Sequence, residues 1–547
     1  MLTKNQRAEV RIESCTPEGY GVCRLEGRAV FVASAMSRER WEILILKVTA
    51  SAVWAKGLRL LETSPCRCEP YCPNLCGGCT LRHMRYEEEL RVKKEHVDDC
   101  LHRLGKQAVG TAVIHPSPLT ERYRNKAIFA VDTVAGKPAF GFYRPRTHTL
   151  VPVRDCLLQS EKCLRAARAL VDFMGMYGVP AYDELTGKGT VRHIFWRESR
   201  REDAVLCIVA ARGFGSLTSA LTVFLREQCP FLTGIVLNIN KTRGNTVLAG
   251  EFYTLWGRPT VKETLCGNEF EVAPQAFLQI NPPQAEALYR KALEYATENS
   301  AGEPAGNTLA LDLYCGAGTV SLCLAARFRK VIGAEIVPQA IENAKENAER
   351  NGIENAEFVC ADAAEIADRL NREGLRPDAV IVDPPRKGLA ESVVRDIAAM
   401  QPARVVYISC NPSTLARDVE RFAALDYRMI TAEAYDMFPR TSHVETVCLL
   451  SKIRSAPHID IDLDMTELDV TKAETKATYE EIKTYVLEHT GLKVSHLYIA
   501  QVKAKHGIIE RDCYNKPKTE GNHVPQCPPE KEKTIEDALR HFQMITD

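Results

Sequence analysis

Short runs in which apolar and polar residues alternate fill positions 5–60 of the chain. Segments such as AEVRIES, GRAVFVA and WEILILKV are separated by the turn-forming sequences PEGYG and LEG. A period of two predicts strands buried on one face, and glycine between the runs predicts tight turns. We therefore expect a small antiparallel β-barrel over residues 1–62, with few or no helices.

A helical pattern and then a mixture of patterns follow the barrel. YEEELRVKKEHVDDCLHRLG has the spacing of an amphipathic helix that ends at Gly105. From about residue 110 to residue 275, strand-like segments such as KAIFAVD, AVLCIVAARG and GIVLNIN are interrupted by helical ones. This mixture predicts a central α+β domain over residues 63–275.

Buried strands alternate regularly with helices after residue 276. TLALDLYCG, KVIGAEI, AEFVCAD, DAVIVDPP and RVVYISC have the composition of buried strands, and YRMITAEAYDMF and ETVCLLSKI follow with no room for a helix between them. Five parallel strands closed by an antiparallel hairpin form a doubly wound α/β domain of Rossmann-like type, which we place at residues 276–454.

The tail, residues 455–547, has a different character. It starts with the acidic, alternating sequence HIDIDLDMTELDV and continues with two helical patterns, ATYEEIKTYVLEHTGLKV and EKEKTIEDALRHFQMI. We expect a small appended module there, and the sequence gives no indication of its role. The chain as a whole is expected to be multidomain, because 547 residues exceed what one core supports.

Charge and hydropathy narrow the class of protein. The 71 basic and 71 acidic side chains balance, but residues 1–160 carry 25 basic against 17 acidic, so a polyanion would meet this third first. No run of about 18 apolar residues occurs, and MLTKNQRAEVRIES lacks the apolar core of a signal peptide. We expect a cytoplasmic, monomeric protein with no membrane partner.

A glycine turn joins the first strand of the doubly wound domain to a helix. In LDLYCGAGTVSLCLA, Gly316 and Gly318 would let the backbone approach a ligand at the helix N-terminus. The third glycine of the dinucleotide fingerprint is missing, which disfavours a nicotinamide cofactor, whereas Glu335 at the end of the next strand can accept hydrogen bonds from ribose hydroxyls. The pattern favours S-adenosylmethionine.

Further polar residues follow the strands of the same domain. Asp362 comes after the third strand and Asp383 after the fourth, in DPPRKG. The carboxyl ends of parallel strands share one rim of the sheet, where such folds bind ligands. Cys410, in VYISCNPSTLARD, ends the fifth strand just before a helix, and the helix N-terminus is expected to lower the pKa of its thiol.

A thiolate beside a methyl donor suggests a pyrimidine substrate, because carbon 5 of uracil is a poor nucleophile until the ring is activated. Addition of the thiolate at carbon 6 gives an enolate whose carbon 5 attacks the methyl group; a base then removes the carbon 5 proton and the cysteine is eliminated. FPRTSHVETVCLL offers His443 and Glu445 as the base, and the residues alone leave this choice open.

Four motifs resemble those of the RNA 5-methyluridine methyltransferase family: DLYCGAGT, DPPRKG, YISCNPSTLARD and MFPRTSHVETV, in this order. The resemblance covers about residues 3–454. It implies that Cys410 is the nucleophile and that Glu445, rather than His443, takes the proton. The cofactor contacts that it implies are Gln279 (in QAFLQINPPQA), Tyr314, Glu335 and Asp383.

Five cysteines crowd into residues 66–79, and VRDCLL adds Cys156 much later. By spacing alone, an iron-sulfur cluster and a zinc ion are equally compatible with them. The ribosomal-RNA branch of the family carries a four-iron four-sulfur cluster at matching positions, which implies the ligands Cys72, Cys76, Cys79 and Cys156. That branch has five residues between the first two ligands and this chain has three, so Cys68 or Cys66 is an alternative first ligand.

The N-terminal barrel, with PEGYGVCRLEGRAVFV, resembles the TRAM domain, an RNA-binding module of oligonucleotide-binding (OB) type, although SRERWE replaces its usual PGE step. Basic and aromatic residues that suit phosphate contact and base stacking interleave in the central domain. They are Arg122, Tyr123, Arg124, Lys126, Phe142, Tyr143, Arg144 and Arg146, with a further mixture in RHIFWRESRR.

These observations predict a methyltransferase that makes 5-methyluridine in RNA, with 23S ribosomal RNA as the expected substrate and transfer RNA as an alternative. An RNA cytosine-5 methyltransferase would use the same adduct chemistry, but it would be expected to carry a cysteine after proline where DPPRKG has none. A non-enzymatic RNA-binding or iron-sulfur assembly factor would not need Cys410 and Glu445 together on one rim.

Overall fold

The computed structural model describes residues 2–70, 72, 74, 76–145, 147–244, 246–297, 308–453, 477–506, 508, 526–542 and 544–545. The chain divides into two compact units, Met1–Arg454 (unit 1) and Ser455–Asp547 (unit 2), and each is described by itself. The described residues of unit 1 form three larger sheets and one two-stranded sheet.

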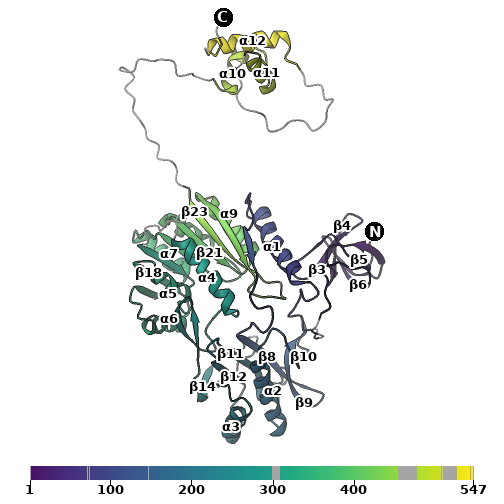
Figure 1. Ribbon diagram of the computed structural model, residues 1–547, viewed down its shortest axis with the longest axis vertical. Helices are drawn as coiled ribbons and strands as arrows, with labels where there is room; N and C mark the ends of the chain where they lie inside the picture. Colours follow the sequence, from purple (N-terminus) through teal and green to yellow (C-terminus); the bar gives the residue numbers. More distant parts are fainter. Residues whose placement is uncertain are drawn as a thin grey trace. The chain divides into compact units, whose positions relative to one another are not determined.

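The N-terminal sheet of unit 1 is six-stranded and curled, with the order β1-β5-β6-β4-β3-β2 (purple in Figure 1). Its strands are β1 (Arg7–Arg11), β2 (Ser14–Cys15), β3 (Tyr20–Leu25), β4 (Arg28–Ala33), β5 (Arg40–Val48) and β6 (Val53–Glu62). No helix occurs in the described residues 2–62, as the alternating pattern predicts. Along β4, Val30 and Val32 are buried while Phe31 between them faces outward.

Helix α1 (Tyr86–Arg103) follows the cysteine-rich loop. Three glutamates lie in its first turn, and His102 and Arg103 lie in its last turn, so the charges complement the helix dipole. The buried stripe of α1 includes Val97 and Leu101, which pack into the core of the C-terminal sheet. This helix therefore covers part of the C-terminal sheet, although it precedes the central domain in sequence.

The central sheet is seven-stranded, with the order β10-β9-β8-β11-β12-β13-β14. The strands are β8 (Lys126–Val134), β9 (Lys137–Tyr143), β10 (Leu150–Pro152), β11 (Val191–Glu198), β12 (Ala204–Ala210), β13 (Gly234–Ile239) and β14 (Glu251–Gly257). Helices α2 (Glu161–Met176) and α3 (Thr218–Gln228), the latter preceded by a 3-10 turn at Gly215–Leu217, pack on one face (Figure 1). A hairpin of β15 (Val261–Leu265) and β16 (Asn268–Val272) follows.

The C-terminal sheet is eight-stranded, with the order β19-β18-β17-β20-β21-β23-β22-β7. Its strands are β7 (Val113–His115), β17 (Leu309–Leu313), β18 (Lys330–Glu335), β19 (Ala356–Cys360), β20 (Ala379–Val382), β21 (Arg404–Ser409), β22 (Tyr427–Tyr435) and β23 (Glu445–Lys452). Strands β17 to β21 are parallel, and the hairpin β22–β23 is antiparallel with β23 against β21. The predicted parallel sheet with a closing hairpin is confirmed.

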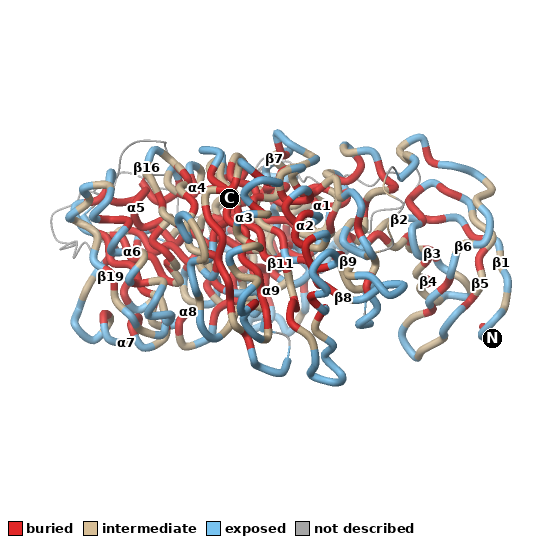
Figure 2. The backbone as a smooth tube through the Cα atoms, turned by 90° about the horizontal axis from the view of Figure 1, so that it is seen from below, coloured by how far each residue is buried: buried red, intermediate tan, exposed pale blue. Residues whose placement is uncertain are grey.

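Helices cover both faces of this sheet. They are α4 (Pro282–Thr297), α5 (Thr319–Ala325), α6 (Pro338–Arg350), α7 (Ala363–Arg372), α8 (Glu391–Met400) and α9 (Pro412–Ala423). Helices α4, α5 and α6 share one core with alternate strand residues, and α7, α8 and α9 share the other with α1. Figure 2 shows the buried residues concentrated along the strands, with exposed loops at their ends. The doubly wound architecture places the strand ends at one rim.

Strand β7 is an element that the hydrophobic pattern did not indicate. Its three residues run parallel to β22 and extend the C-terminal sheet by one strand, with Tyr435 opposite His115. Their rings stack at a centroid distance of 4.4 Å. A segment from the start of the central domain thus becomes the edge of the C-terminal sheet.

Unit 2 contains helices α10 (Tyr479–Thr490), α11 (His496–Lys505) and α12 (Pro529–His541), which share a core of their own. The two predicted helical patterns coincide with α10 and α12, whereas α11 was not predicted. The acidic sequence HIDIDLDMTELDV lies outside the described residues. In the parts of both units that the structure describes, we find no helix with the length and apolar composition needed to cross a membrane.

Candidate active site

Cys410 and Glu445 are brought together at the rim of the C-terminal sheet. Cys410 directly follows β21, and Glu445 begins β23, its antiparallel neighbour. The last paired residues of these strands are Ser409 and Thr446, so one further step in register sets Cys410 opposite Glu445. Glu445 is 3% exposed, whereas Cys410 is partly open to solvent. The thiol therefore faces an accessible space with a buried carboxyl group beside it.

The expected lowering of the Cys410 pKa is wrong for this structure. Burial, and then the nearby carboxylates Glu445 and Asp383, raise the pKa of Cys410 to about 11, although Arg386 acts in the opposite direction. The start of α9 does not offset this effect, because the Asn411 side chain accepts the hydrogen bond from the Ser413 N–H at 3.1 Å. The helix N-terminus is capped by an amide rather than by the thiolate.

Asp383 lies close to two further carboxyl groups, those of Asp312 and Glu445, and both Asp383 and Glu445 lie near the thiol. Burial, with Asp312 nearby, raises the pKa of Asp383 to about 7, and burial raises the pKa of Asp312, in β17, to about 7 as well. Burial and then Asp383 raise the pKa of Glu445 well above its usual range. Carboxyl groups with pKa values this high can hold or accept a proton near neutral pH.

Arg386 is a site residue that the sequence reasoning did not single out. Its guanidinium lies 3.3 Å from His443 Nε2, and burial and then Arg386 lower the pKa of that imidazole to about 4. His443 is therefore neutral at physiological pH. Arg386 is also the cation that opposes the raised pKa values of Cys410 and Glu445. Its position within DPPRKG was the signal that could have identified it.

The two motif loops on either side of the thiol are tied to each other. Asn411 Nδ2 donates to the Arg386 carbonyl at 3.0 Å. In α9, the fully buried Asp418 accepts hydrogen bonds from the Leu389 N–H and the Tyr407 hydroxyl, both at 2.8 Å. These bonds fix the DPPRKG loop against the start of α9 and so hold Arg386 near Cys410.

The glycine turn after β17 has the shape of a ligand cradle. Gly316 and Gly318 both have positive φ, and Tyr314 beside them has φ +68°. A Cβ atom at Gly318 would meet the Phe358 ring at 3.0 Å, whereas nothing lies within 4 Å of one at Gly316. Gly318 is thus required by packing, and Gly316 leaves open space over the backbone that a ligand can occupy.

The other predicted cofactor residues surround this turn. Glu335 accepts hydrogen bonds from the Gly316 N–H at 3.3 Å and the Val337 N–H at 3.0 Å, which leaves lone pairs on both carboxylate oxygens. Asp362 is exposed and caps α7 through the Ala364 N–H. Burial, then Asp362, Asp418 and Glu335, raise the pKa of Tyr314 to about 12. These side chains fit a nucleoside with free hydroxyl groups.

Gln279 lies apart from the glycine turn in sequence, in the loop before α4. It is 5% exposed, and its carbonyl accepts a hydrogen bond from Asn125 Nδ2 at 3.0 Å. Two residues on, Asn281 donates to Ser117 Oγ at 3.0 Å and to the Met437 carbonyl at 3.2 Å. The loop that carries Gln279 is thereby attached to the loop between β22 and β23.

Four of the six candidate cluster cysteines line one small, largely enclosed and apolar cavity: Cys72, Cys76, Cys79 and Cys156. Cys68 and Cys66 do not line it; the Cys68 thiol donates to the Arg82 carbonyl instead. Arg82 closes the loop by donating to the Cys72 and Asn74 carbonyls, both at 2.6 Å. Within the described residues, no group of three or more Cys, His, Asp or Glu side chains is arranged to hold a single metal ion.

The candidate RNA contacts of the central domain have different surroundings. Arg122 donates to the Cys156 and Gln159 carbonyls, both at 2.9 Å, so it supports the cysteine cavity. Tyr123 is 4% exposed and its hydroxyl donates to the Pro439 carbonyl, so the expectation that its ring stacks on a base is wrong. Arg144 is exposed, and Arg146 lies outside the described residues.

Lys126 and Phe142, two further candidates, are half-buried. Burial, then Arg197 and Arg124, lower the pKa of Lys126 to about 8. Phe142 packs against the core of the central sheet and lines the cysteine cavity. Both side chains are therefore less open to a macromolecular partner than the sequence pattern suggests.

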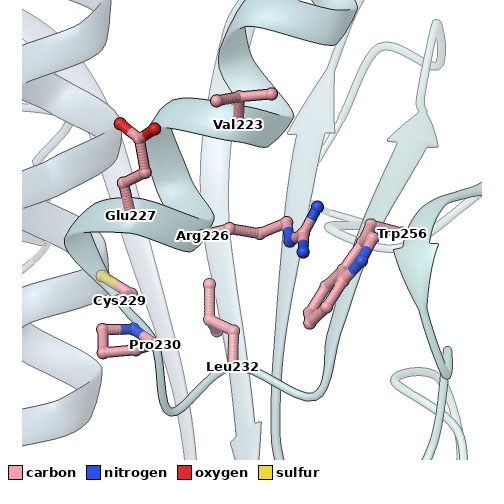
Figure 3. Close-up of a pocket in the computed structure, with 7 residues that line it drawn as sticks. All are labelled: Val223, Arg226, Glu227, Cys229, Pro230, Leu232 and Trp256. Carbon is pink, nitrogen blue, oxygen red and sulfur yellow. The ribbon is translucent and has the colours of Figure 1, made fainter.

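A separate cavity of about 370 Å³ lies between α3 and β14 (Figure 3). Its lining includes Arg226, whose guanidinium lies over the Trp256 ring at 4.5 Å from the centroid. None of the predicted catalytic or cofactor residues belongs to this lining. The candidate site therefore lies at the polar rim of the C-terminal sheet and not in this cavity.

Comparison with known proteins agrees with this geometry. The family model described as tRNA (Uracil-5-)-methyltransferase matches residues 265–453. A protein named as an uncharacterized RNA methyltransferase from Halalkalibacterium halodurans is 36% identical over 456 residues, covering 82% of this chain and 98% of that protein. Another with that description, from Clostridium acetobutylicum, is 35% identical over 458 residues, covering 83% and 98% respectively.

A solved structure also resembles the chain over most of its length. The Pyrococcus abyssi tRNA (uracil-54, C5)-methyltransferase in complex with S-adenosyl-L-homocysteine is 27% identical, with a TM-score of 0.65, and the match covers 81% of this chain and 100% of that one. The chain belongs to the RNA uracil-5-methyltransferase family and is an S-adenosylmethionine-dependent RNA methyltransferase.

Proposed function

We propose that the protein methylates carbon 5 of uridine in RNA through a covalent bond between Cys410 and carbon 6, with Glu445 as the base. The observation that carries this proposal is the register of β21 and β23, in which Cys410 continues opposite Glu445. The reaction needs a thiol that attacks carbon 6 and a base that removes the proton from carbon 5, and Cys410 and Glu445 offer these two groups.

The reaction proceeds through a covalent adduct between the protein and the RNA. The Cys410 sulfur forms a bond to carbon 6, and the electrons of the carbon 5–carbon 6 double bond move toward the carbonyl at carbon 4. Carbon 5 would then take the methyl group of S-adenosylmethionine as the methyl–sulfur bond breaks, and neutral S-adenosylhomocysteine would leave with the electron pair of that bond. Glu445 then removes the proton from carbon 5, and the released electron pair restores the double bond and expels the Cys410 thiolate.

The thiol must lose its proton before it can attack. With a pKa of about 11, Cys410 is protonated at neutral pH in the free enzyme. Asp383 has a pKa of about 7 and lies close enough to affect the thiol, so its carboxylate is suited to accept that proton. Glu445 is the buried partner whose raised pKa makes it a stronger base for the later step.

Residues of the same rim are proposed to bind the cofactor. Glu335 would accept the ribose hydroxyls, with Gly316 giving the backbone room to approach, and Tyr314 and Asp362 would flank the nucleoside. Gln279 and Asp383 would lie nearer the methyl-bearing end. Open space at Gly316 and the free lone pairs of Glu335 support this assignment.

The decisive test uses RNA that contains 5-fluorouridine, because fluorine at carbon 5 cannot leave as a cation and the adduct is trapped. Wild-type protein should form a covalent complex that survives denaturation, and Cys410→Ala should form none and transfer no methyl group. Glu445→Gln should accumulate a complex with ordinary uridine RNA, since proton removal is slowed. Turnover retained by Cys410→Ala would exclude the mechanism.

We propose 23S ribosomal RNA as the substrate, on the resemblance of the N-terminal sheet and the cysteine-rich loop to the ribosomal-RNA branch. Transfer RNA is a second candidate, favoured by the Pyrococcus abyssi enzyme, which acts on tRNA and matches a share of this chain almost as large as unit 1. Domain composition therefore does not separate the two substrates. Mapping 5-methyluridine in both RNAs, from cells with and without the protein, distinguishes them.

The outward face of the N-terminal sheet is proposed to bind unpaired bases. The Phe31 and Trp54 rings are stacked at a centroid distance of 4.9 Å, and Tyr20 meets Trp54 edge-on at 5.3 Å. Lys56 is two residues from Trp54 on β6 and so shares its face. Aromatic rings beside basic side chains on a sheet face are typical of single-stranded RNA recognition.

We propose that Cys72, Cys76, Cys79 and Cys156 hold a four-iron four-sulfur cluster. The four cysteines line one small apolar cavity, so the 72–79 loop and the distant Cys156 meet there, and four thiolates are the ligand set of such a cluster. When bound, the cluster would join the 72–79 loop to Cys156. Anaerobic purification should give about four irons per chain, and stoichiometric zinc would refute the assignment.

A further inference from the structure

A group of buried charges lies between α1 and the loop that joins β22 to β23. The Lys93 side chain has no exposure, and its Nζ lies 2.8 Å from Glu89 Oε1 and 2.6 Å from Asp436 Oδ1, both equally buried. Lys93 also donates to the Phe438 carbonyl at 3.1 Å. One ammonium on α1 thus binds both its own helix and the first residues of a loop more than 340 positions away in sequence.

Further bonds hold the same loop from the same side. The Tyr86 hydroxyl donates to Asp436 Oδ2 at 2.8 Å, and the Arg440 N–H donates to Glu89 Oε1 at 2.6 Å. The Leu81 N–H donates to the Arg440 carbonyl at 3.2 Å. Several hydrogen bonds that hold residues 436–440 therefore come from α1 and from the segment just before it.

Buried ion pairs seldom add stability over apolar side chains of the same volume, because two charges must be removed from water. Their short, directional bonds nevertheless fix the atoms that they join. Three charged side chains without solvent exposure indicate that this loop requires a defined position.

This loop joins two residues that pair with each other, Tyr435 at the end of β22 and Glu445 at the start of β23. Asp436, which Lys93 holds, directly follows Tyr435, and His443 lies just before Glu445. Cys410 lies between β21 and α9, outside the loop. A displacement of residues 436–444 would therefore act more directly on Glu445 than on the thiol.

We propose that Lys93 is a positioning residue for proton removal: it anchors the 436–444 loop so that the Glu445 carboxylate reaches the proton on carbon 5. The step is the one in which Glu445 takes that proton, the electron pair restores the carbon 5–carbon 6 bond, and Cys410 leaves as the thiolate. The inference rests on the proposed function.

The test compares two readouts in the full-length protein. Lys93→Met should lower turnover by roughly 10- to 100-fold, the loss expected when a catalytic group moves by about 1 Å. Because adduct formation and methyl transfer precede the affected step, the methylated protein–RNA complex should accumulate on ordinary uridine RNA. Labelled methyl groups in a denaturation-resistant protein band measure it. A merely structural loss would lower all steps and leave no such band.

Lys93→Met leaves two buried carboxylates without a cation, so folding requires a second variant. The triple variant Glu89→Gln/Lys93→Met/Asp436→Asn removes the charges together and should melt close to the wild type while still accumulating the complex. Should it not fold, Lys93→Arg, which keeps the charge but changes the head group, enters the same assay with the same expectation. Wild-type turnover without accumulation in the folded variant overturns the proposal.

Lys94→Met is the matched control, since Lys94 neighbours Lys93 on α1 but pairs with Asp98 near the surface at 2.7 Å. It should behave as wild type in both readouts. The 5-fluorouridine assay distinguishes a failure of the proposed reaction from a failure of the role of Lys93. If wild-type protein traps no adduct, the proposed function is refuted. If wild-type protein traps the adduct but the Lys93 variants turn over normally and accumulate no methylated complex, only the role of Lys93 is refuted.

Discussion

Two oppositely charged neighbours act on the Cys410 thiol. Asp383 raises its pKa and Arg386 lowers it, in addition to the larger effect of burial. Asp383→Asn should therefore lower the pKa of Cys410, so that alkylation by iodoacetamide begins at lower pH than in wild type. Arg386→Gln should shift the profile to higher pH, and each pKa unit changes the thiolate fraction about tenfold at a fixed pH below the midpoint.

The profile is measured by mass spectrometry of the peptide that contains Cys410, which separates this thiol from the other nineteen cysteines. Glu445→Gln should resemble Asp383→Asn, because Glu445 is the other carboxylate that raises the pKa. Melting curves verify that each variant is folded. Shifts of the profile in the same direction for Asp383→Asn and Arg386→Gln would contradict the opposite effects assigned to these two charges, and no shift in either variant would mean that burial alone controls the thiol.

That Cys410 and Glu445 share one rim could be predicted from sequence, because strand ends follow from the pattern of strands and helices and because their motifs are long. The choice of Glu445 over His443 as the base came from the family resemblance and stays a prediction. The pKa of the thiol could not be predicted, since it depends first on how far the thiol is buried and then on which charges lie nearby in space. Asp383 and Arg386 come from a different loop, and Asn411 takes the cap position that the thiolate was expected to exploit. Electrostatics therefore reversed a prediction made from the helix dipole alone.

At the scale of elements, long periodic segments were predicted correctly and short ones were not. Strands β17 to β23 have enough buried residues to be recognised, whereas β7 has three residues and owes its existence to pairing with β22. The burial of Tyr123 was missed for a similar reason: its partner, the Pro439 carbonyl, lies more than 300 positions away. Contacts between segments that are distant in sequence cannot be predicted from the local pattern of apolar and polar residues.

The outward face of the N-terminal sheet gives an element-scale prediction. Trp54→Ala should weaken binding to single-stranded substrate RNA by about 1–3 kcal/mol, the contribution of one stacked base, without changing the salt dependence. Lys56→Met should reduce the slope of log affinity against log salt by about 0.7, as expected for one phosphate contact to a single strand. Fluorescence anisotropy at several salt concentrations measures both effects.

Leu46→Ala is the control, because Leu46 is another exposed apolar side chain of the same sheet, at 45% exposure, and does not belong to the group of rings formed by Tyr20, Phe31 and Trp54. It should leave RNA affinity unchanged. Equal losses for Leu46→Ala and Trp54→Ala would mean that the sheet contributes only general apolar contact, and unchanged affinity for Trp54→Ala would remove the base-stacking role.

At the scale of the whole molecule, three features all belong to unit 1. They are the rim that carries Cys410 and Glu445, the cavity lined by the four cysteines, and the sheet face on which Phe31 and Trp54 stack. Unit 2 has a separate core, in which Ile482, Val486 and Ile535 are almost completely buried. A chain that ends at residue 454 should therefore keep the melting temperature and the methylation rate of the full chain, because the described residues of each unit form hydrophobic cores of their own.

Calorimetry and methyl incorporation into total RNA, with the full chain as reference, measure the two quantities. Residues 477–547 alone should be only marginally helical by circular dichroism, since about 70 residues bury too little apolar surface to be very stable. A truncated chain that melts normally but methylates a different set of uridines would show that the tail selects the RNA. One that melts many degrees lower would contradict the independence of the two units.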